Sequence, residues 1–403
     1  MSRASASLPV LVAGGGIGGL AAALAIARQG FAVKVFEQSP RIGEIGAGIQ
    51  LGPNAFAALD ALGVGERARS RAVYTERMVM MDAVEGAEVA SIDVGAPFRE
   101  RFANPYAVIH RADIHGSLLE GVREATDRIE FVTSTRIATV EQSDSGVAVV
   151  DANGVEHQGI ALIGADGVKS AVRQQFVGDP VCVSGHVVYR AVVDAAEFPA
   201  DLRWNAPAVW AGPNCHLVHY PLCGGEQYNV VVTFHSRREE QWSITEGSAE
   251  EVQSYFTGIL ERPRQLLALP KSWKRWATAD REPISQWSFG RTTLLGDAAH
   301  PMLQYLAQGA CMAMEDAVTL GEALCVHEVS KSGYFALAFE HYQRSRVSRT
   351  ARVVLSAREM GRIYHASGVQ RLVRNDLWRG RSQQHFYDAL EWLYGWRVEN
   401  CLA

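Results

Sequence analysis

The feature that most constrains this chain is a glycine motif between a buried strand and a helix. Residues 9–16, PVLVAGGG, begin with a short apolar run, residues 17–30 form an alanine-rich helical stretch closed by a glycine, and residues 31–38 again have strand character. A strand, a helix and a second strand in this order make a βαβ unit, which in a parallel sheet is right-handed and covered on both faces. The chain is therefore predicted to be an α/β protein.

The glycines of this motif, Gly14, Gly16 and Gly19, have the spacing GxGxxG. The first permits a tight turn, the second lets a pyrophosphate approach the backbone, and the third lets the helix pack closely on the strand. Glu37 ends the second strand, at the position where a carboxylate accepts hydrogen bonds from a ribose 2′-hydroxyl group. The motif predicts a Rossmann-like site for a dinucleotide without a 2′-phosphate, and leaves FAD and NAD open as alternatives.

Composition and charge narrow the range of partners. The net charge of −5 is spread over 403 residues without long runs of one sign, which argues against nucleic acid or a polybasic membrane contact. The six cysteines have no metal-ligand or redox spacing, so no metal is predicted and free thiols are expected. No secretory leader and no apolar run of membrane-spanning length is evident. A cytoplasmic protein with a small-molecule partner is therefore expected.

The residue composition and the pattern of predicted strands and helices change several times along the chain. Residues 129–154 resemble the strands of a small meander, and residues 181–287 are rich in Val, Tyr and Trp strands. The tail is arginine-rich, aromatic and helical in pattern. Three parts are predicted: a discontinuous dinucleotide-binding domain of residues 1–75, 101–180 and 288–330, an inserted β-rich substrate domain of residues 76–100 and 181–287, and a helical C-terminal region of residues 331–403.

Three further stretches are GADGVKSAVR at 164–173, GDAAHP at 296–301 and HRADIHGSLL at 110–119. With the glycine motif, and in this order, they resemble the fingerprints of the class A flavoprotein aromatic hydroxylases, single-component FAD monooxygenases with a para-hydroxybenzoate hydroxylase-like fold. The resemblance covers nearly the whole chain. It implies FAD bound without a covalent link. Because the chain has no second GxGxxG unit, it also implies that reduced nicotinamide docks transiently.

The resemblance also assigns residues to the cofactor. Arg111 would contact FAD, Asp297 would bind its ribityl chain, and the turn at Asp166 would be approached by both FAD and the nicotinamide nucleotide. Gly309 and Ala310 are small residues at the start of a predicted helix. They would let the flavin ring lie against bare backbone, with the positive end of the helix directed at it.

The stretch CHLVHYP at 215–221 reads as a strand with unusual polar side chains. Because side chains alternate along a strand, His216 and Tyr220 share one face, with Val218 between them, and His219 lies on the other. Electrophilic attack on a ring is easier when its hydroxyl group is ionised, and a base with a pKa near 6.5 suits that step. His216 is therefore the predicted base, with Tyr220 and Gln304 orienting the hydroxyl group. His219 and His300 are predicted to be structural.

Two residues depart from the broader family pattern. Gln304 stands where a proline is more usual, and Ala307 where a glycine is usual. The set of His216, Tyr220 and Gln304 resembles that of the 3-hydroxybenzoate 6-hydroxylases in this family. It implies hydroxylation of 3-hydroxybenzoate para to its hydroxyl group, with NADH and O₂, through a flavin C4a-hydroperoxide, to give 2,5-dihydroxybenzoate (gentisate).

Three alternatives stay open at this point: hydroxylation of salicylate, hydroxylation of 6-hydroxynicotinate, and a non-oxygenating protein that binds FAD or NAD. A homodimer is expected, and the aromatic segment at residues 385–396 is a candidate for its interface.

Overall fold

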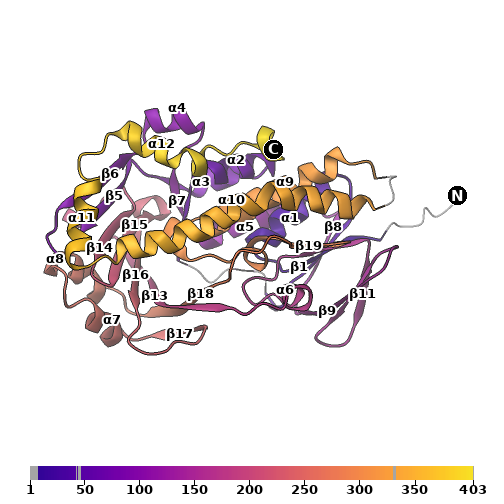
Figure 1. Ribbon diagram of the computed structural model, residues 1–403, viewed down its shortest axis with the longest axis horizontal. Helices are drawn as coiled ribbons and strands as arrows, with labels where there is room; N and C mark the ends of the chain where they lie inside the picture. The colour runs from indigo at the N-terminus through magenta and orange to yellow at the C-terminus, as the bar shows by residue number, and fades with distance from the viewer. Residues whose placement is uncertain (1–7, 42, 44–46, 330–332, 403) are drawn as a thin grey trace.

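The computed structural model describes residues 8–41, 43, 47–329 and 333–402. The predicted domain boundary between residues 330 and 331 lies outside these ranges. Residues 1–7, where no secretory leader is expected, also lie outside them. The chain folds around two large sheets (Figure 1). Both contribute to the candidate site described below.

The first sheet has six strands and contains the predicted βαβ unit. Five strands run parallel, and only the edge strand β19 is antiparallel to its neighbour. The strands lie in the order β19 (Ser288–Phe289), β20 (Thr292–Leu294), β12 (Ala161–Gly164), β1 (Val10–Ala13), β2 (Val33–Phe36) and β8 (Ile129–Val132). All four residues of β1 and of β12 are buried, as expected of parallel strands covered on both faces.

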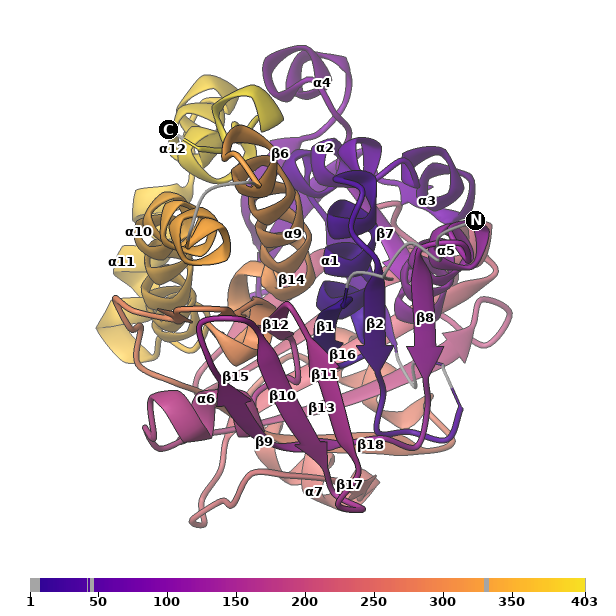
Figure 2. The same ribbon diagram turned by 90° about the vertical axis from the view of Figure 1, so that its right-hand side faces the viewer.

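Helices cover one side of this sheet, and a small three-stranded sheet covers the other (Figure 2). The helices on this side and around it are α1 (Ile17–Arg28), α2 (Pro53–Ala61), α3 (Gly65–Arg71), α5 (Arg111–Glu124) and α9 (Gly309–Val326). The antiparallel sheet on the opposite side consists of β9 (Ile137–Gln142), β10 (Val147–Asp151) and β11 (Glu156–Gly159). The predicted meander is therefore wrong in one respect, since β8 belongs to the parallel sheet.

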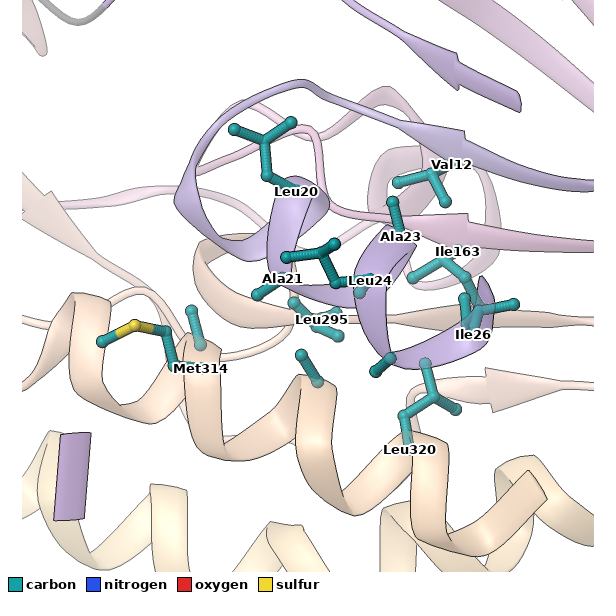
Figure 3. Close-up of a cluster of buried hydrophobic side chains, with 14 of the residues drawn as sticks. Val12, Leu20, Ala21, Ala23, Leu24, Ile26, Ile163, Leu295, Met314 and Leu320 are labelled. Atoms are coloured by element: carbon teal, nitrogen blue, oxygen red, sulfur yellow. The ribbon is translucent and has the colours of Figure 1, made fainter. Parts of the chain in front are cut away.

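The packing of α1 explains why this helix is rich in alanine. It lies between the parallel sheet and α9, and nearly every residue along it is buried. In Figure 3, α1 passes between Val12 of β1 and the helix α9, which carries Met314 and Leu320. A side chain on Gly321 of α9 would come within 3.2 Å of Cβ of Ala25 in α1. A helix that is buried all round needs apolar residues on every face. Small apolar residues such as alanine let both the parallel sheet and α9 pack closely against α1.

The second large sheet has eight strands and is mostly antiparallel, with β14 and β5 as a parallel pair. Its strands lie in the order β17 (Ser243–Gly247), β18 (Trp273–Asp280), β13 (Cys182–Asp194), β16 (Gln227–His235), β15 (Cys215–Leu222), β14 (Ala208–Gly212), β5 (Arg77–Asp82) and β6 (Glu88–Asp93). A further three-stranded sheet consists, in this order, of β3 (Gly48–Leu51), β7 (Ala107–His110) and β4 (Val73–Tyr74).

The C-terminal region is helical, as predicted. The long helix α10 (Tyr334–Tyr364) runs diagonally across the molecule in Figure 1, from the side of the parallel sheet to that of the eight-stranded sheet. The remaining helices are α4 (Ala96–Phe102), α6 (Ala171–Phe176), α7 (Ala249–Tyr255), α8 (Glu261–Arg264), α11 (Gly368–Trp378) and α12 (Gln383–Tyr394).

The predicted fold class is confirmed by this architecture. The strands within residues 76–100 and 181–287 form the eight-stranded sheet, while the parallel sheet is built from the other predicted segments. Where the domain boundaries fall stays a prediction. The six cysteines are free thiols. Within the described ranges, no helix has the length and apolar character needed to cross a membrane.

Candidate active site

A cavity of about 1130 Å³ lies where the carboxyl ends of three parallel strands meet the eight-stranded sheet. The turns that follow β1, β12 and β20 line one side, and residues of β13, β15 and β16 line the other. The volume slightly exceeds the range of about 300–1,000 Å³ that is usual for a small-molecule site. Because doubly wound folds bind ligands at the carboxyl edge of the sheet, this cavity is the candidate active site.

The glycine motif forms the turn between β1 and α1. Gly14 has a φ of +106°, and a side chain there would strike the carbonyl group of Ala165. A side chain on Gly19 would strike the carbonyl oxygen of Gly14, so turn and helix pack this closely only with glycine at both positions. Gly16 precedes α1, lines the cavity and has open space in place of a side chain. The backbone at this helix N-terminus is therefore open to a phosphate group.

The Glu37 carboxylate, just after β2, holds the glycine turn in place. One oxygen accepts a hydrogen bond from the backbone N–H of Gly15 at 2.9 Å, and the other accepts one from that of Ser39 at 2.8 Å. The buried His115 of α5 contacts the same turn, with Nε2 at 2.9 Å from the carbonyl oxygen of Gly15. The sequence did not predict this contact of His115. Binding of a ribose hydroxyl group by Glu37 stays a prediction.

Four other predicted cofactor residues line the cavity. Arg111 is the first residue of α5, Asp297 follows β20, and Gly309 and Ala310 begin α9. A side chain on Gly309 would come within 3.9 Å of a carboxylate oxygen of Asp297, so the start of α9 and the turn after β20 lie side by side. The structure thus brings all four to the same cavity.

Asp166 is placed differently. Its carboxylate accepts hydrogen bonds from the backbone N–H groups of Ala171 at 2.7 Å and Val172 at 3.3 Å, at the start of α6. Its neighbours Ala165 and Gly167 line the cavity. Burial is the main reason that the pKa of Asp166 is raised. The side chain therefore supports the turn, and the contact of this turn with cofactors stays a prediction.

The predicted cofactor residues of the cavity fit FAD. The open backbone at Gly16 suits a pyrophosphate, and the small residues Gly309 and Ala310 leave room for a flat ring system beside the N-terminus of an 18-residue helix. The cavity then continues to His216 and Tyr220. One continuous space can therefore hold the cofactor at one end and a small aromatic ring at the other.

A buried charge network holds the loop that carries Asp297. Asp316 of α9 accepts hydrogen bonds from the backbone N–H of Gly296 at 3.1 Å, from the ring of His300, and from Arg346 of α10 at 2.7 Å. Burial alone would raise the pKa of Asp316, but His300 and Arg346 outweigh it and lower that pKa to about 2. The network keeps Asp316 ionised and fixes both ends of the loop. It also confirms that His300 is structural.

Glu315, the preceding residue, extends this network to α2. Its carboxylate accepts hydrogen bonds from Arg346 and from Asn54 of α2, each at 2.7 Å. Asn54 also donates a hydrogen bond to the side-chain oxygen of Gln308 at 2.9 Å, and Gln308 is the residue just before α9. The start of α9 is therefore held in position from two sides.

The three residues predicted to act on the substrate all reach the cavity. His216 and Tyr220 lie on β15, and Gln304 begins a short 3₁₀ helix, η5 (Gln304–Leu306). Gln304 Nε2 donates to the hydroxyl oxygen of Thr233 at 3.4 Å, and Thr233 lies directly opposite His216 in the sheet. The structure therefore brings Gln304, from a distant loop, beside His216.

Tyr220 lies where the eight-stranded sheet meets β3. A side chain on Gly48 of β3 would come within 2.9 Å of the Tyr220 hydroxyl group, so the glycine makes room for the ring. The backbone N–H of Gly48 donates a hydrogen bond to the side-chain oxygen of Asn229 at 3.0 Å, which connects β3 to β16. Burial raises the pKa of Tyr220, so its hydroxyl group stays protonated at neutral pH and can donate a hydrogen bond.

His216 is only 3% exposed and is surrounded by other rings. Its Nδ1 lies 2.8 Å from Nε2 of His365, and the ring centres of Tyr305 and Tyr364 lie 5.5 and 5.3 Å away. Burial, with a smaller effect of His186, lowers the pKa of His216 to about 3. The ordinary pKa near 6.5 expected from the sequence is therefore wrong. The ring is neutral at neutral pH and can accept a proton, but it does not hold one well.

His219 is structural, as predicted from the alternation along the strand. It lies on the opposite face of β15, is fully buried, and its Nε2 accepts a hydrogen bond from the indole N–H of Trp210 at 3.2 Å.

Two further residues of the site were not predicted from the sequence. Arg190 of β13 lines the cavity, and its guanidinium carbon lies 5.6 Å from the ring centre of Trp276. The only signal for it is a lone arginine in an apolar strand, YRAVV. His365 follows α10 and is 149 residues from His216, so no local pattern connects the two.

Ala307 lies in the left-handed region, with a φ of +53°. An alanine there is strained by roughly 1–2 kcal/mol, whereas glycine adopts this conformation freely. Replacing it, Ala307→Gly, is expected to raise the free energy of unfolding of the FAD-bound protein by up to about 1 kcal/mol, because relief of strain exceeds the added entropy of the unfolded chain. Urea denaturation measures this. Ala249→Gly, in a helix, should instead destabilise, and a destabilised Ala307→Gly variant would contradict the interpretation.

Comparison with known proteins agrees with this geometry. Residues 7–356 match a family model described as FAD binding domain. The chain is 71% identical, over the full length of both proteins, to 3-hydroxybenzoate 6-hydroxylase from Polaromonas naphthalenivorans (strain CJ2). It is 59% identical to the protein of that name from Klebsiella oxytoca, over 97% of this chain and 98% of the relative.

A solved structure of an HpxO variant from Klebsiella pneumoniae in complex with FAD is 26% identical, with a TM-score of 0.82, over 95% of this chain and 97% of that one. The family match spans both large sheets and most of α10. These matches favour an oxygenating enzyme over the alternative of a non-oxygenating dinucleotide-binding protein. The chain belongs to the FAD binding domain family, and it is a flavoprotein aromatic monooxygenase.

Proposed function

We propose that this chain hydroxylates 3-hydroxybenzoate para to its hydroxyl group, with NADH and O₂, and releases gentisate. The observation that carries the proposal is the placement of Gln304 beside His216 in the cavity that also holds the predicted FAD-binding residues. The high identity to two proteins named 3-hydroxybenzoate 6-hydroxylase supports the choice of substrate. NADH rather than NADPH follows from the family resemblance.

The residues of the cavity have complementary roles in this reaction. When bound, FAD supplies the reduction of O₂ and the transfer of one oxygen atom to the ring. Gln304 and Tyr220 orient the substrate hydroxyl group, and His216 accepts its proton. Loss of that proton raises the electron density at the ring carbons ortho and para to the oxygen. It therefore directs the electrophilic attack to these positions. Two cavity cations, Arg111 and Arg190, suit an anionic carboxylic acid.

Exclusion of water from the cavity is also required, because water would divert the reaction to H₂O₂ and no product would form. The face around His216 is lined by buried aromatic residues, Tyr305 at 5% exposure among them. Val218 between His216 and Tyr220 is 8% exposed and gives an apolar surface for the ring. These residues support a closed pocket for one aromatic ring.

A cytoplasmic homodimer completes the proposal. The free thiols fit a reducing compartment. The segment at residues 385–396 packs mostly within its own chain, whereas an apolar stripe on α11 is exposed and better suits an interface. The stripe consists of Val369, Leu372, Val373 and Leu377, exposed by 74%, 52%, 50% and 59%.

Turnover of a substrate panel tests the proposed function. NADH loss, O₂ uptake and product are measured together for benzoate, salicylate, 3-hydroxybenzoate, 4-hydroxybenzoate and 6-hydroxynicotinate. We expect 3-hydroxybenzoate alone to give product, gentisate, in a ratio near one to the NADH consumed. Better-coupled formation of catechol from salicylate, or of a hydroxylated pyridine, would favour the alternatives instead.

The same panel with Gln304→Pro tests the role of the glutamine, since proline removes the side chain that orients the hydroxyl group. We expect the coupling with 3-hydroxybenzoate to fall. If the substrate preference and the product do not change, Gln304 is no longer a reason to choose 3-hydroxybenzoate as the substrate.

A further inference from the structure

A second, smaller cavity of about 280 Å³ adjoins the candidate active site. We call it the side pocket, and the lining residues that matter below are Ala47, Arg190, Asp194, Lys271, Lys274 and Trp276. It lies where the pairing of β13 with β18 ends, since Arg190 and Lys274 are the last residues paired there. Arg190 lines both spaces, and the chain neighbours Ala47 and Gly48 line one each. The two cavities are therefore adjacent, with Arg190 at their boundary.

The side pocket has an aromatic wall that is open to solvent. Lys274 and Trp276 share one face of β18 because side chains alternate along a strand, and the pairing of Arg190 with Lys274 puts Arg190 on that face too. The guanidinium carbon of Arg190 lies 5.6 Å from the ring centre of Trp276. Trp276 is half-buried, and Ile244, directly opposite it on β17, is 56% exposed. This part of the sheet therefore offers a flat surface on which a ring can stack.

The charge of Arg190 favours an anionic ligand. Burial lowers the pKa of Arg190, and the polar neighbours that act on it are the Tyr220 hydroxyl group and a second cation, Arg111. No carboxylate among the described residues contributes to that pKa. A partly desolvated cation without a carboxylate beside it is stabilised when an anion binds next to it.

The rim of the side pocket carries charges of both signs. Lys274 pairs with Glu246, and Lys271 pairs with Glu197 at 3.0 Å. All four side chains are well exposed, so these pairs are weak and a phosphate group can replace either carboxylate. Asp194 is also exposed and lines the side pocket. A carboxylate there accepts hydrogen bonds from a ribose hydroxyl group and repels a phosphate attached to the ribose.

We propose that the side pocket binds the adenosine half of NADH. The adenine ring stacks on Trp276, and the pyrophosphate lies between Arg190 and Lys274. A ribose hydroxyl group donates a hydrogen bond to Asp194, and the nicotinamide half extends past Arg190 into the larger cavity. The proposal rests on the proposed function, since it takes NADH as the reductant.

The size of the side pocket fits one half of the dinucleotide. Its volume of about 280 Å³ is just below the range of about 300–1,000 Å³ usual for a complete small ligand. Neighbouring strands are about 4.8 Å apart, so β18 lies roughly 14 Å from β15, three strands away. An extended dinucleotide spans such a distance along one face of the sheet. NADH can therefore bind without a second glycine motif.

Anaerobic stopped-flow reduction tests the side pocket. FAD-bound protein with saturating 3-hydroxybenzoate is mixed with NADH, and the loss of oxidised-flavin absorption gives the Kd for NADH and the limiting rate of reduction. We expect Trp276→Leu to raise this Kd at least about fivefold, the lower end of what stacking of one base on an aromatic ring contributes. The limiting rate should stay nearly the same, because the contacts of the nicotinamide half are unchanged.

Lys274→Met changes an exposed residue and keeps the test usable if Trp276→Leu does not fold. We expect it to raise the Kd for NADH about threefold and to weaken the dependence of this Kd on salt concentration. The matched control is Arg262→Met of α8, a cation outside the side pocket whose side chain is 51% accessible, against 46% for Lys274. This control should bind NADH as the wild type does.

Asp194→Asn tests the selectivity of the side pocket. Loss of the carboxylate removes its repulsion of the 2′-phosphate group of NADPH. We expect the Kd for NADPH, divided by that for NADH, to fall at least about threefold. The same anaerobic reduction with each nucleotide gives both values. An unchanged ratio would overturn the role of Asp194 in the side pocket.

An unchanged Kd for NADH in both Trp276→Leu and Lys274→Met would overturn the side pocket as the NADH site. A raised Kd for 3-hydroxybenzoate alone, measured from the flavin spectrum, would overturn it too and assign the side pocket to the aromatic acid. A single turnover separates these results from the proposed function. Flavin reduced by light is mixed with O₂ and 3-hydroxybenzoate, and the wild type and Trp276→Leu should give equal gentisate. If neither forms gentisate while the Kd for NADH rises as expected, the assigned substrate is refuted and the side pocket is supported.

Discussion

Replacing Arg346 by methionine is expected to lower the free energy of unfolding of the FAD-bound protein by about 3–5 kcal/mol, the range for removing one partner from a buried ion pair. Arg346 is fully buried and donates to Glu315 and to Asp316, each at 2.7 Å. Arg349 still pairs with Glu315 at 2.6 Å, so most of the loss falls on Asp316. Urea denaturation at a fixed FAD concentration, followed by tryptophan and flavin fluorescence, measures the change.

The pH dependence of stability gives a second measurement of the same network. The pKa of Asp316 is about 2 in the folded chain and about 3.9 in an unfolded one. Its stabilising contribution is therefore complete above the unfolded value and is lost as the pH falls through about 2. Without Arg346 the folded pKa rises, so we expect acid unfolding at a higher pH.

The matched control is Arg349→Met. Arg349 is partly exposed, with 16% of its side-chain surface accessible, so its loss should cost less. Equal destabilisation by both substitutions, or an acid midpoint that does not move in Arg346→Met, would show that the network does not hold the structure as described.

Replacing His216 by alanine is expected to lower the rate of hydroxylation by roughly 10²–10⁴-fold, the range for loss of a general base. FAD should stay bound, because His216 lies on β15 of the eight-stranded sheet and the glycine turn lies on the parallel sheet. NADH oxidation would continue and form H₂O₂ in place of product. Gentisate and H₂O₂ per NADH consumed, at saturating 3-hydroxybenzoate, measure the effect.

His219→Gln serves as the control for removal of a buried histidine from the same strand, and should keep the wild-type ratio of product to NADH. The prediction for His216 fails if His216→Ala has the same product ratio, rate and pH profile as the wild type while FAD remains bound.

Much of the fold could be predicted from local patterns. The βαβ unit follows from a glycine motif flanked by buried apolar segments, and α9 was expected to start at Gly309 and is found at Gly309–Val326. The prediction of a single meander at residues 129–154 was wrong in one strand, because short strands of similar composition look alike in sequence. Only tertiary pairing places β8 beside β2 and separates it from β9 and β10.

The candidate site was predictable only in part. Alternation along β15 correctly separates the cavity face of His216 from the core face of His219, and the family resemblance points to Gln304. The link between Gln304 and Thr233 spans 71 residues, and the partner of His216 lies on the C-terminal tail. Such contacts have no local signal. The lowered pKa of His216 could not be predicted either, because it depends on burial created by several distant elements.

The central claim, that His216 takes the proton from the ring hydroxyl group, is tested most directly by a substrate that does not need the base. A ring-fluorinated 3-hydroxybenzoate whose hydroxyl group is already ionised at the working pH is compared with 3-hydroxybenzoate in the wild type and in His216→Ala. If His216 acts as the base, its removal should cost at least about a hundredfold with 3-hydroxybenzoate and less than about tenfold with the ionised analogue. Equal losses with both substrates would contradict the claim.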